Sequence, residues 1–265
     1  MTDSRVGDAL DWPFVKTTLV YDVINSTSDR AAELVRERRT QLPLIVWARS
    51  QTRGRGRGNH EWWSDAGSLT FTLAIDPTAH GLTTEIEPRI ALATAVAVIE
   101  ALDDLAVGHP LIGIRWPNDL EAAGQKLGGI LPERVETANG HRILIGIGIN
   151  VYTDLAHAPH HVSAMATTLA ALTGRAFDEG SLHLLIPAFL RRFQAVVMRL
   201  VTGDASLVDQ WQRLDLLRDT WVRVECGTHL VNGLAAGIDA DGSLSVREGL
   251  QKRQIVGGKV LRDAH

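Results

Sequence analysis

The sequence predicts an α+β protein, in which a large domain of interspersed helices and strands is followed by a small all-β domain. Between about residues 15 and 201, short apolar or alternating runs typical of strands are mixed with longer runs at helical spacing. After Trp211 only short β-type runs remain, and glycines interrupt them as far as Arg262. We therefore expect two domains, 1–212 and 213–265.

The N-terminal elements follow from local patterns. A β-rich run at residues 15–23 ends at a polar stretch, and apolar residues then recur at helical spacing, so Ser26 or a neighbour can cap a helix that runs to about Arg38. The nearly continuous apolar run at residues 43–48 is typical of a buried strand. Strict alternation predicts a further strand at residues 68–75.

Later elements are expected on the same grounds. The longest helical pattern, residues 86–105, is rich in alanine and apolar enough to be mostly buried. Strands are predicted at residues 113–116, 127–131 and 142–149, and weaker helices around 161–172 and 182–201. In the C-terminal segment, Asp241-Gly242 between alternating runs predicts a β-hairpin.

Composition excludes several classes of protein. Hydrophobic residues make up 45% and charged residues 22% of the 265, which is ordinary for a globular chain. No apolar run approaches the roughly 20 residues of a membrane-spanning helix, and residues 1–11 lack the apolar core of a secretory signal. The single cysteine, Cys226, excludes an internal disulfide, so we expect a cytoplasmic protein. A net charge of −4 gives the chain no overall attraction for nucleic acid.

Positive charge is nevertheless concentrated in one segment. Arg49, Arg53, Arg55 and Arg57 lie close together, with glycines after the last three. Glycine allows a close approach of the backbone to a ligand, and the planar guanidinium suits carboxylate and phosphate oxygens. The segment predicts a loop that holds a small anion. A solvated surface turn and an RGG-like RNA-binding tract are the alternatives.

Two further motifs carry polar groups at strand ends. In Arg115-Trp116-Pro117-Asn118-Asp119, proline ends a strand and places the last two side chains at a turn that can face a cleft. Lys126 enters the next apolar run, where it can offset charge on a phosphate or a developing oxyanion. An ordinary turn and an edge-strand lysine are the alternatives.

The third motif, Gly146-Ile147-Gly148-Ile149-Asn150, alternates glycine with isoleucine. Such a strand has one face without side chains. That face leaves room either for a ligand against the backbone or for close packing of a helix.

Together and in this order, Ser26-Thr27, QxxGRGR with Trp62, RWPND, KLxGIL and GIGIN resemble the catalytic domain of the biotin–protein ligase family. The resemblance runs from about Val15 to Arg262. It implies a biotin/lipoate ligase-type domain with a mixed sheet and flanking helices, followed by a small SH3-like β-barrel. Too few residues precede Ser26 for the winged-helix domain of some members, so we expect no specific DNA binding.

The resemblance also implies the reaction. ATP with Mg²⁺ adenylates biotin to biotinyl-5′-AMP and releases pyrophosphate, and a lysine of a biotin carboxyl carrier protein then takes the biotin. This chemistry needs charge stabilisation and positioning rather than a covalent nucleophile. No membrane partner is expected, and whether the chain forms a homodimer stays open.

Residue roles carry over by position. The resemblance makes Lys126, Arg55 and Arg57 catalytic. It assigns biotin to a set of polar side chains and glycines: Ser26, Thr27, Gln51, Gly54, Arg55, Lys126 and Gly129. The nucleotide falls to Arg57, Trp62, Asn118, Asp119, Asn150 and Arg262, with Mg²⁺ accompanying ATP and no certain metal ligand in the chain. Helix caps at Ser26 and Thr27, a core anchor at Trp62 and a solvated tail at Arg262 are the structural alternatives.

The chain departs from the family pattern at several positions. Ser28 stands where asparagine is usual, and Arg53 stands where a small residue is usual. Pro132 precedes Glu133 at a position where a residue other than proline is usual. Residues 59–61 read Asn-His-Glu rather than supplying another arginine, which puts contacts to the triphosphate in doubt. Two rival functions are a lipoate or octanoate ligase or transferase of the same fold, which lacks QxxGRGR followed by WPND, and a non-catalytic biotin- or RNA-binding module.

Overall fold

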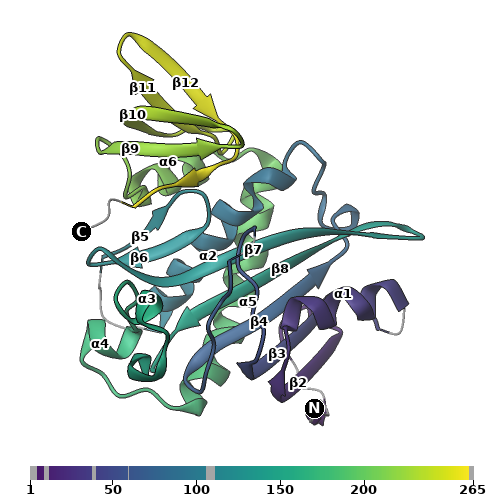
Figure 1. Ribbon diagram of the computed structural model, residues 1–265. Coiled ribbons are helices and arrows are strands. Elements are labelled where there is room, and N and C mark those ends of the chain that lie inside the picture. The colour runs from purple at the N-terminus through teal and green to yellow at the C-terminus, as the bar shows by residue number, and fades with distance from the viewer. Residues whose placement is uncertain (1–4, 9–11, 38–39, 59, 106–110, 263–265) are drawn as a thin grey trace.

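The computed structural model describes residues 5–8, 12–37, 40–58, 60–105 and 111–262. A mixed eight-stranded sheet with the order β1-β2-β3-β4-β8-β7-β6-β5 forms the larger part (Figure 1). Its strands are β1 (Arg5–Asp8), β2 (Thr17–Ile24), β3 (Leu44–Gln51), β4 (Ser68–Ile75), β5 (Ile112–Arg115), β6 (Asp119–Ala122), β7 (Gln125–Thr137) and β8 (Gly140–Asn150). The β2–β3 pair is parallel and the other neighbours are antiparallel, which confirms the predicted mixed sheet.

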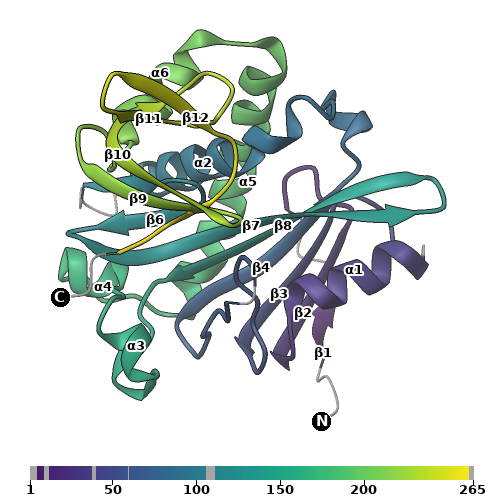
Figure 2. The same ribbon diagram turned by 45° about the horizontal axis from the view of Figure 1, so that its top comes forward.

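Helices cover both faces of this sheet (Figure 1, Figure 2). Helix α1 (Thr27–Glu37) packs on one face, while α2 (Ile90–Asp104) and α5 (Glu179–Thr202) pack together on the other. Strand β3 is buried on both faces, which explains why its sequence is continuously apolar. Ile45 and Trp47 join the cluster with α2 and α5, whereas Leu44, Val46 and Ala48 join the cluster under α1. The prediction of a buried strand is confirmed.

The long alanine-rich pattern forms α2, and most of its residues are buried, as predicted. Its first turn is a separate 3-10 helix at Glu87–Arg89. Helix α5 begins after Asp178, whose carboxylate accepts a hydrogen bond from the Ser181 backbone N–H at 2.9 Å. The predicted end of the first helix near Arg38 lies outside the described residues.

The single helix predicted around residues 161–172 is wrong. Two short helices, α3 (His160–Ser163) and α4 (Leu169–Thr173), stand there instead. Between them the backbone pairs with the start of β7, because the Lys126 N–H donates to the Met165 carbonyl at 2.8 Å and the Thr167 N–H donates to the Lys126 carbonyl at 2.9 Å. A strand-like pairing across this segment replaces the helical hydrogen bonds.

The C-terminal sheet has five antiparallel strands in the order β12-β11-β10-β9-β13. These are β9 (Trp221–Cys226), β10 (His229–Ile238), β11 (Leu244–Glu248), β12 (Gln251–Ile255) and β13 (Lys259–Val260). The turn at Asp241-Gly242 joins β10 to β11, so the predicted hairpin is confirmed. The sequence prediction missed β1, β6, β12 and helix α6 (Ala205–Leu214), all of them short.

The C-terminal sheet packs firmly against the larger part. Trp116 Nε1 donates to the Gly242 carbonyl at 2.9 Å, and Gln212 Nε2 donates to the Ile238 carbonyl at 3.0 Å. Buried residues of both parts belong to one continuous hydrophobic cluster. The predicted division at 212/213 falls near the end of α6 and stays a prediction. In the described part of the chain, no helix is both long and apolar enough to cross a membrane.

Candidate active site

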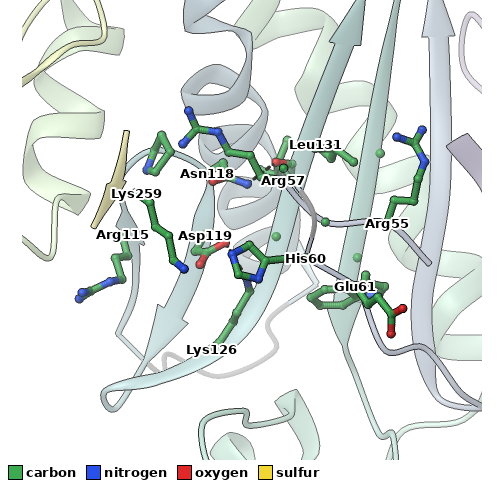
Figure 3. A pocket seen from close by; sticks show the side chains of 18 of the residues that line it. Arg55, Arg57, His60, Glu61, Arg115, Asn118, Asp119, Lys126, Leu131 and Lys259 are labelled. Carbon is green, nitrogen blue, oxygen red and sulfur yellow. Dashed lines mark hydrogen bonds and ion pairs between the residues drawn. The ribbon is translucent and has the colours of Figure 1, made fainter. Parts of the chain in front are cut away.

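One cavity of about 850 Å³ lies between the two sheets, within the size range of small-molecule sites (Figure 3). Its walls come from the start of α1, the loop after β3, strands β6, β7 and β8, and the strand β13 with the residues around it. Segments far apart in the sequence therefore meet here. All the predicted site residues except Gly54 line it: Ser26, Thr27, Gln51, Arg55, Arg57, Trp62, Asn118, Asp119, Lys126, Gly129, Asn150 and Arg262.

Uncharged polar groups form one end of the cavity. Gln51 Oε1 accepts hydrogen bonds from the Thr27 backbone N–H at 2.7 Å and from Thr27 Oγ1 at 3.1 Å. Ser26 Oγ accepts from the Asp29 N–H at 3.3 Å, so Ser26 caps α1 and lines the cavity at once. Because its carbonyl oxygen is already used, Gln51 has its side-chain N–H groups left to offer.

The departure at Ser28 is accommodated at this end. Ser28 is buried, and its hydroxyl lies 3.1 Å from Thr72 Oγ1. A Cβ on Gly146 would come within 2.9 Å of Ser28 Oγ. Gly146 therefore makes room for helix α1. At this position the alternative of close packing against a helix applies.

Gly54 does not line the cavity. The Trp62 N–H donates to its carbonyl at 2.9 Å, and a Cβ on Gly54 would stand 2.3 Å from the Trp62 carbonyl oxygen. Gly56 N–H likewise donates to the His60 carbonyl at 2.7 Å. The glycine is thus needed because the two arms of the loop pair closely there, and the structure brings no support for its predicted contact with biotin.

Trp62 closes the loop against the sheet. A Cβ on Gly148 would stand 2.4–2.7 Å from three atoms of the indole, so the ring lies directly on the glycine. Lys126 Nζ lies 5.9 Å from the ring centroid, within range of a cation–π contact. The Trp62 Nε1 atom is buried and has no hydrogen-bond partner among the described residues. The flat face of the GIGIN strand holds this ring.

Arg55 is bound to acidic side chains at the edge of the cavity. Its two terminal nitrogens each donate to a Glu133 carboxylate oxygen at 2.6 Å, and its Nε lies 2.8 Å from Asp29 Oδ1. The hydrogen bonds with Glu133 raise the pKa of Arg55. The guanidinium lies on the far side of the cavity from Lys259 (Figure 3).

Arg57 extends from the same loop to the C-terminal sheet. Its Nη1 donates to the carbonyl oxygen of Gly258, in the turn between β12 and β13. The loop is therefore tied to the C-terminal sheet across the cavity.

An ion pair lies on strands β6 and β7. Lys126 Nζ donates to Asp119 Oδ1 at 2.6 Å, and a Cβ on Gly129 would be 3.6 Å from Lys126 Nζ. Asn118 Nδ2 donates to the Ile130 carbonyl at 2.7 Å, which fixes the turn before β6. The buried Asn150 donates from Nδ2 to the Thr167 carbonyl at 3.2 Å.

Cations from both sheets line the cavity beside the C-terminal sheet. Arg262 Nη2 donates to the carboxylate of Glu121, and Arg115 Nη2 donates to the Leu261 carbonyl at 3.3 Å. Lys259 faces the same space as Asp119 and Lys126 (Figure 3). Among the described arginines and lysines that line the cavity, Lys259 is the one without a carboxylate or carbonyl partner.

Sequence reasoning missed Lys259 and Glu121. Lys259 belongs to a two-residue strand, and no local pattern reveals that it lies across the cavity from Asp119 and Lys126. Glu121 is an acid between Leu120 and Ala122 in a strand of four residues, and a charge inside an apolar run was the available signal.

The mixed sheet, the C-terminal sheet and the cavity between them are those of the biotin/lipoate ligase class of proteins. Residues 20–150 match the model of the biotin/lipoate A/B protein ligase family. The chain is 30% identical over 259 residues to the bifunctional ligase/repressor BirA of Bacillus spizizenii, covering 95% of this chain and 77% of that protein. It is 34% identical over 219 residues to the biotin–[acetyl-CoA-carboxylase] ligase of Paracoccus denitrificans, covering 80% and 86%.

The chain belongs to the biotin–protein ligase family. A solved structure of the biotin protein ligase from Aquifex aeolicus in complex with biotin and ATP has the same fold, with a TM-score of 0.77, 22% identity and coverage of 92% of this chain and 97% of that one. The expected family and fold are therefore confirmed.

Proposed function

We propose that this chain is an ATP-dependent biotin–protein ligase, which forms biotinyl-5′-AMP and transfers biotin to a lysine of a biotin carboxyl carrier protein. One observation carries the proposal: a single cavity is lined by uncharged hydrogen-bonding groups and Arg55 beside α1, and by several cations beside the C-terminal sheet. Biotinyl-5′-AMP has the same division, since its ureido ring is neutral and its phosphate is anionic. The complex of the Aquifex relative with biotin and ATP supports this assignment.

The neutral end suits the ureido ring. Its carbonyl needs donors, and its two N–H groups need acceptors. Gln51 offers side-chain N–H groups, and Ser26 can donate its hydroxyl proton while it caps α1. Thr27, held by Gln51 and Thr72, fixes the position of Gln51.

In the first half-reaction, a carboxylate oxygen of biotin attacks the α-phosphorus of ATP and pyrophosphate leaves with the electron pair of the broken bond. Repulsion between the carboxylate and the phosphate opposes this approach. Lys126, oriented by Asp119, reduces that repulsion, and Arg57 adds a second cation. In the second half-reaction, the amine of the carrier attacks the acyl carbon and AMP leaves.

Arg55 requires a rearrangement to take the role that the family resemblance gives it. Its guanidinium is held by Glu133 and Asp29, so contact with the biotin carboxylate means exchanging these partners. We expect Arg55 to form that contact only when biotin is bound.

We assign ATP to the part of the cavity beside the C-terminal sheet, where the cations gather. Trp62 supplies a flat ring, and Asn118 and Asn150 supply amides in the same cavity. Arg262 and Lys259 supply charge from the C-terminal segment. Lys259 offsets the absence of an arginine at residues 58–61, which read Gly-Asn-His-Glu. Asn59 itself lies outside the described residues.

Mg²⁺ accompanies ATP in this proposal. Within the described residues, no group of three or more His, Cys, Asp or Glu side chains could hold a metal. Mg²⁺ does not require such a group, since it keeps several waters and is commonly bound by one or two carboxylates together with substrate phosphates. Asp119, which lines the cavity beside Lys126, would be such a carboxylate, and Mg²⁺ would supply charge neutralisation at the phosphates.

The test is incubation with ATP, Mg²⁺, biotin and an apo carrier domain, read by avidin blot and by pyrophosphate release. Release that requires both ATP and biotin, together with labelled carrier, is expected. Release with lipoate or octanoate in place of biotin would identify the rival ligase. RNA binding with a steep salt dependence and no pyrophosphate release would identify the binding module. The cytoplasmic location and the absence of specific DNA binding also stay predictions.

A further inference from the structure

Glu121 is a buried carboxylate that the reaction described above does not use. It lies in β6 with 4% of its surface exposed, and it is not part of the cavity wall. Burial raises the pKa of Glu121, while the charges of Arg262 and Arg115 lower it. A buried charge is costly unless it is paired and hydrogen-bonded, so the partners of this group matter.

Both partners are arginines, and they come from different domains. Arg262 follows β13 and donates from Nη2 to Glu121 Oε1. Arg115 ends β5, and its Nε lies 3.9 Å from the same oxygen. Arg115 also donates to the Leu261 carbonyl at 3.3 Å, so the segment after β13 is held at two adjacent residues.

The pairing leaves Arg262 able to bind a ligand. A guanidinium has five N–H donors in a rigid plane, and the hydrogen bond to Glu121 uses Nη2. Arg262 also lines the cavity. Fixing one edge of the plane therefore fixes the direction in which the remaining donors face.

We propose that Glu121 is a positioning residue that orients Arg262 toward the phosphates of ATP. The proposal rests on the function proposed above and adds a residue from outside the cavity to it. Glu121 acts through Arg262, so its removal weakens ATP binding and leaves biotin binding, at the other end of the cavity, unchanged.

The test compares Glu121→Gln, Arg262→Ala and the double variant by biotin-dependent pyrophosphate release, with KM for ATP, KM for biotin and kcat measured separately. We expect Glu121→Gln to raise the KM for ATP by roughly tenfold, the scale of one charge-assisted hydrogen bond. The KM for biotin should stay constant. In the Arg262→Ala background, Glu121→Gln should have no further effect on the KM for ATP.

Glu136→Gln is the matched control, because Glu136 is exposed on β7 and pairs with Arg134 at 2.8 Å. Its kinetics should equal those of the parent protein. If Glu121→Gln fails to fold, as judged by circular dichroism, the comparison is made with Glu121→Asp, which keeps the charge and should raise the KM for ATP by a smaller factor.

Three results would overturn the inference. These are an unchanged KM for ATP, a lower one, which would mean that Glu121 holds Arg262 away from the ligand, or effects that multiply in the double variant. Failure of the parent protein to release pyrophosphate would instead defeat the proposed function, so the two failures are distinguishable.

Discussion

Replacing Gly148 by alanine tests whether the position of Trp62 matters for the reaction. Gly148 lies in the middle of the large sheet, where β8 pairs with β4 on one side and β7 on the other. The new Cβ would stand 2.4 Å from Trp62 Cε2, whereas ordinary contact begins at 3.4 Å. Because the strand is fixed on both sides, the indole must retreat by about 1 Å.

Two effects set the expected magnitude. Overpacking of this kind destabilises the folded protein by about 1–3 kcal/mol. Alanine also restricts the unfolded chain more than glycine does, which stabilises the folded protein by up to about 1 kcal/mol. The free energy of unfolding should therefore fall by about 1–2 kcal/mol, which corresponds to a decrease in Tm of roughly 2–8 °C for a protein of this size. The KM for ATP should rise, since the ring that lies beside Lys126 has moved.

The assays are thermal unfolding and pyrophosphate release at varied ATP. Gly180→Ala, at the exposed start of α5, is the control: it shares the loss of glycine's freedom in the unfolded chain, so its Tm should stay the same or rise slightly, and its KM for ATP should not change. Trp62→Phe in the Gly148→Ala protein should restore part of the stability, because the smaller ring leaves space for the methyl group. If Gly148→Ala matches the parent in both Tm and KM for ATP, the packing of Trp62 on this strand has been misjudged.

The remaining predictions concern charge. Lys126→Ala removes a charge-assisted contact of roughly 1.5–3 kcal/mol and should slow formation of biotinyl-AMP by about ten- to a hundredfold; an unchanged rate in single-turnover assays would refute its role. Arg57→Gly removes the tie to Gly258 and should release biotinyl-AMP into solution in the absence of carrier, so a lack of free biotinyl-AMP by chromatography would show that the loop is not a lid. Burial raises the pKa of the Asp215 carboxyl, so the folded protein holds its proton at a pH where the unfolded chain has lost it. Stability therefore falls as pH rises from the ordinary carboxyl pKa through the raised one. Asp215→Asn should show a smaller fall in denaturant titrations between about pH 4 and pH 7, and an identical slope would count against this interpretation.

Much of the site could be predicted because its chemistry lies in short contiguous motifs. The spacing of residues 51–57, 115–119, 126–131 and 146–150 is sufficient to identify the family, and these segments do meet around one cavity. Long periodic elements such as α2 were predictable for the same reason, since their pattern is local.

What could not be predicted depends on contacts between distant segments. The partners of Arg55 are Asp29 and Glu133, and nothing in the loop sequence indicates them. The break between α3 and α4 arises from pairing with β7 rather than from a breaking residue. Tertiary contacts override local propensity in the second case, and in the first the fold alone brings the partners together.

The loop at residues 53–62 depends on three such contacts at once. Gly54 pairs with Trp62 at its base, Trp62 lies on Gly148, and Arg57 reaches Gly258 in the other domain. A loop with few buried apolar contacts of its own opens at low cost, so these anchors decide how long it stays over the cavity. Of these three, the tie to Gly258 is the contact that joins the loop to the C-terminal sheet. Its loss should therefore affect retention of the adenylate more than formation of the adenylate, which is the kinetic separation expected of Arg57→Gly and not of Lys126→Ala.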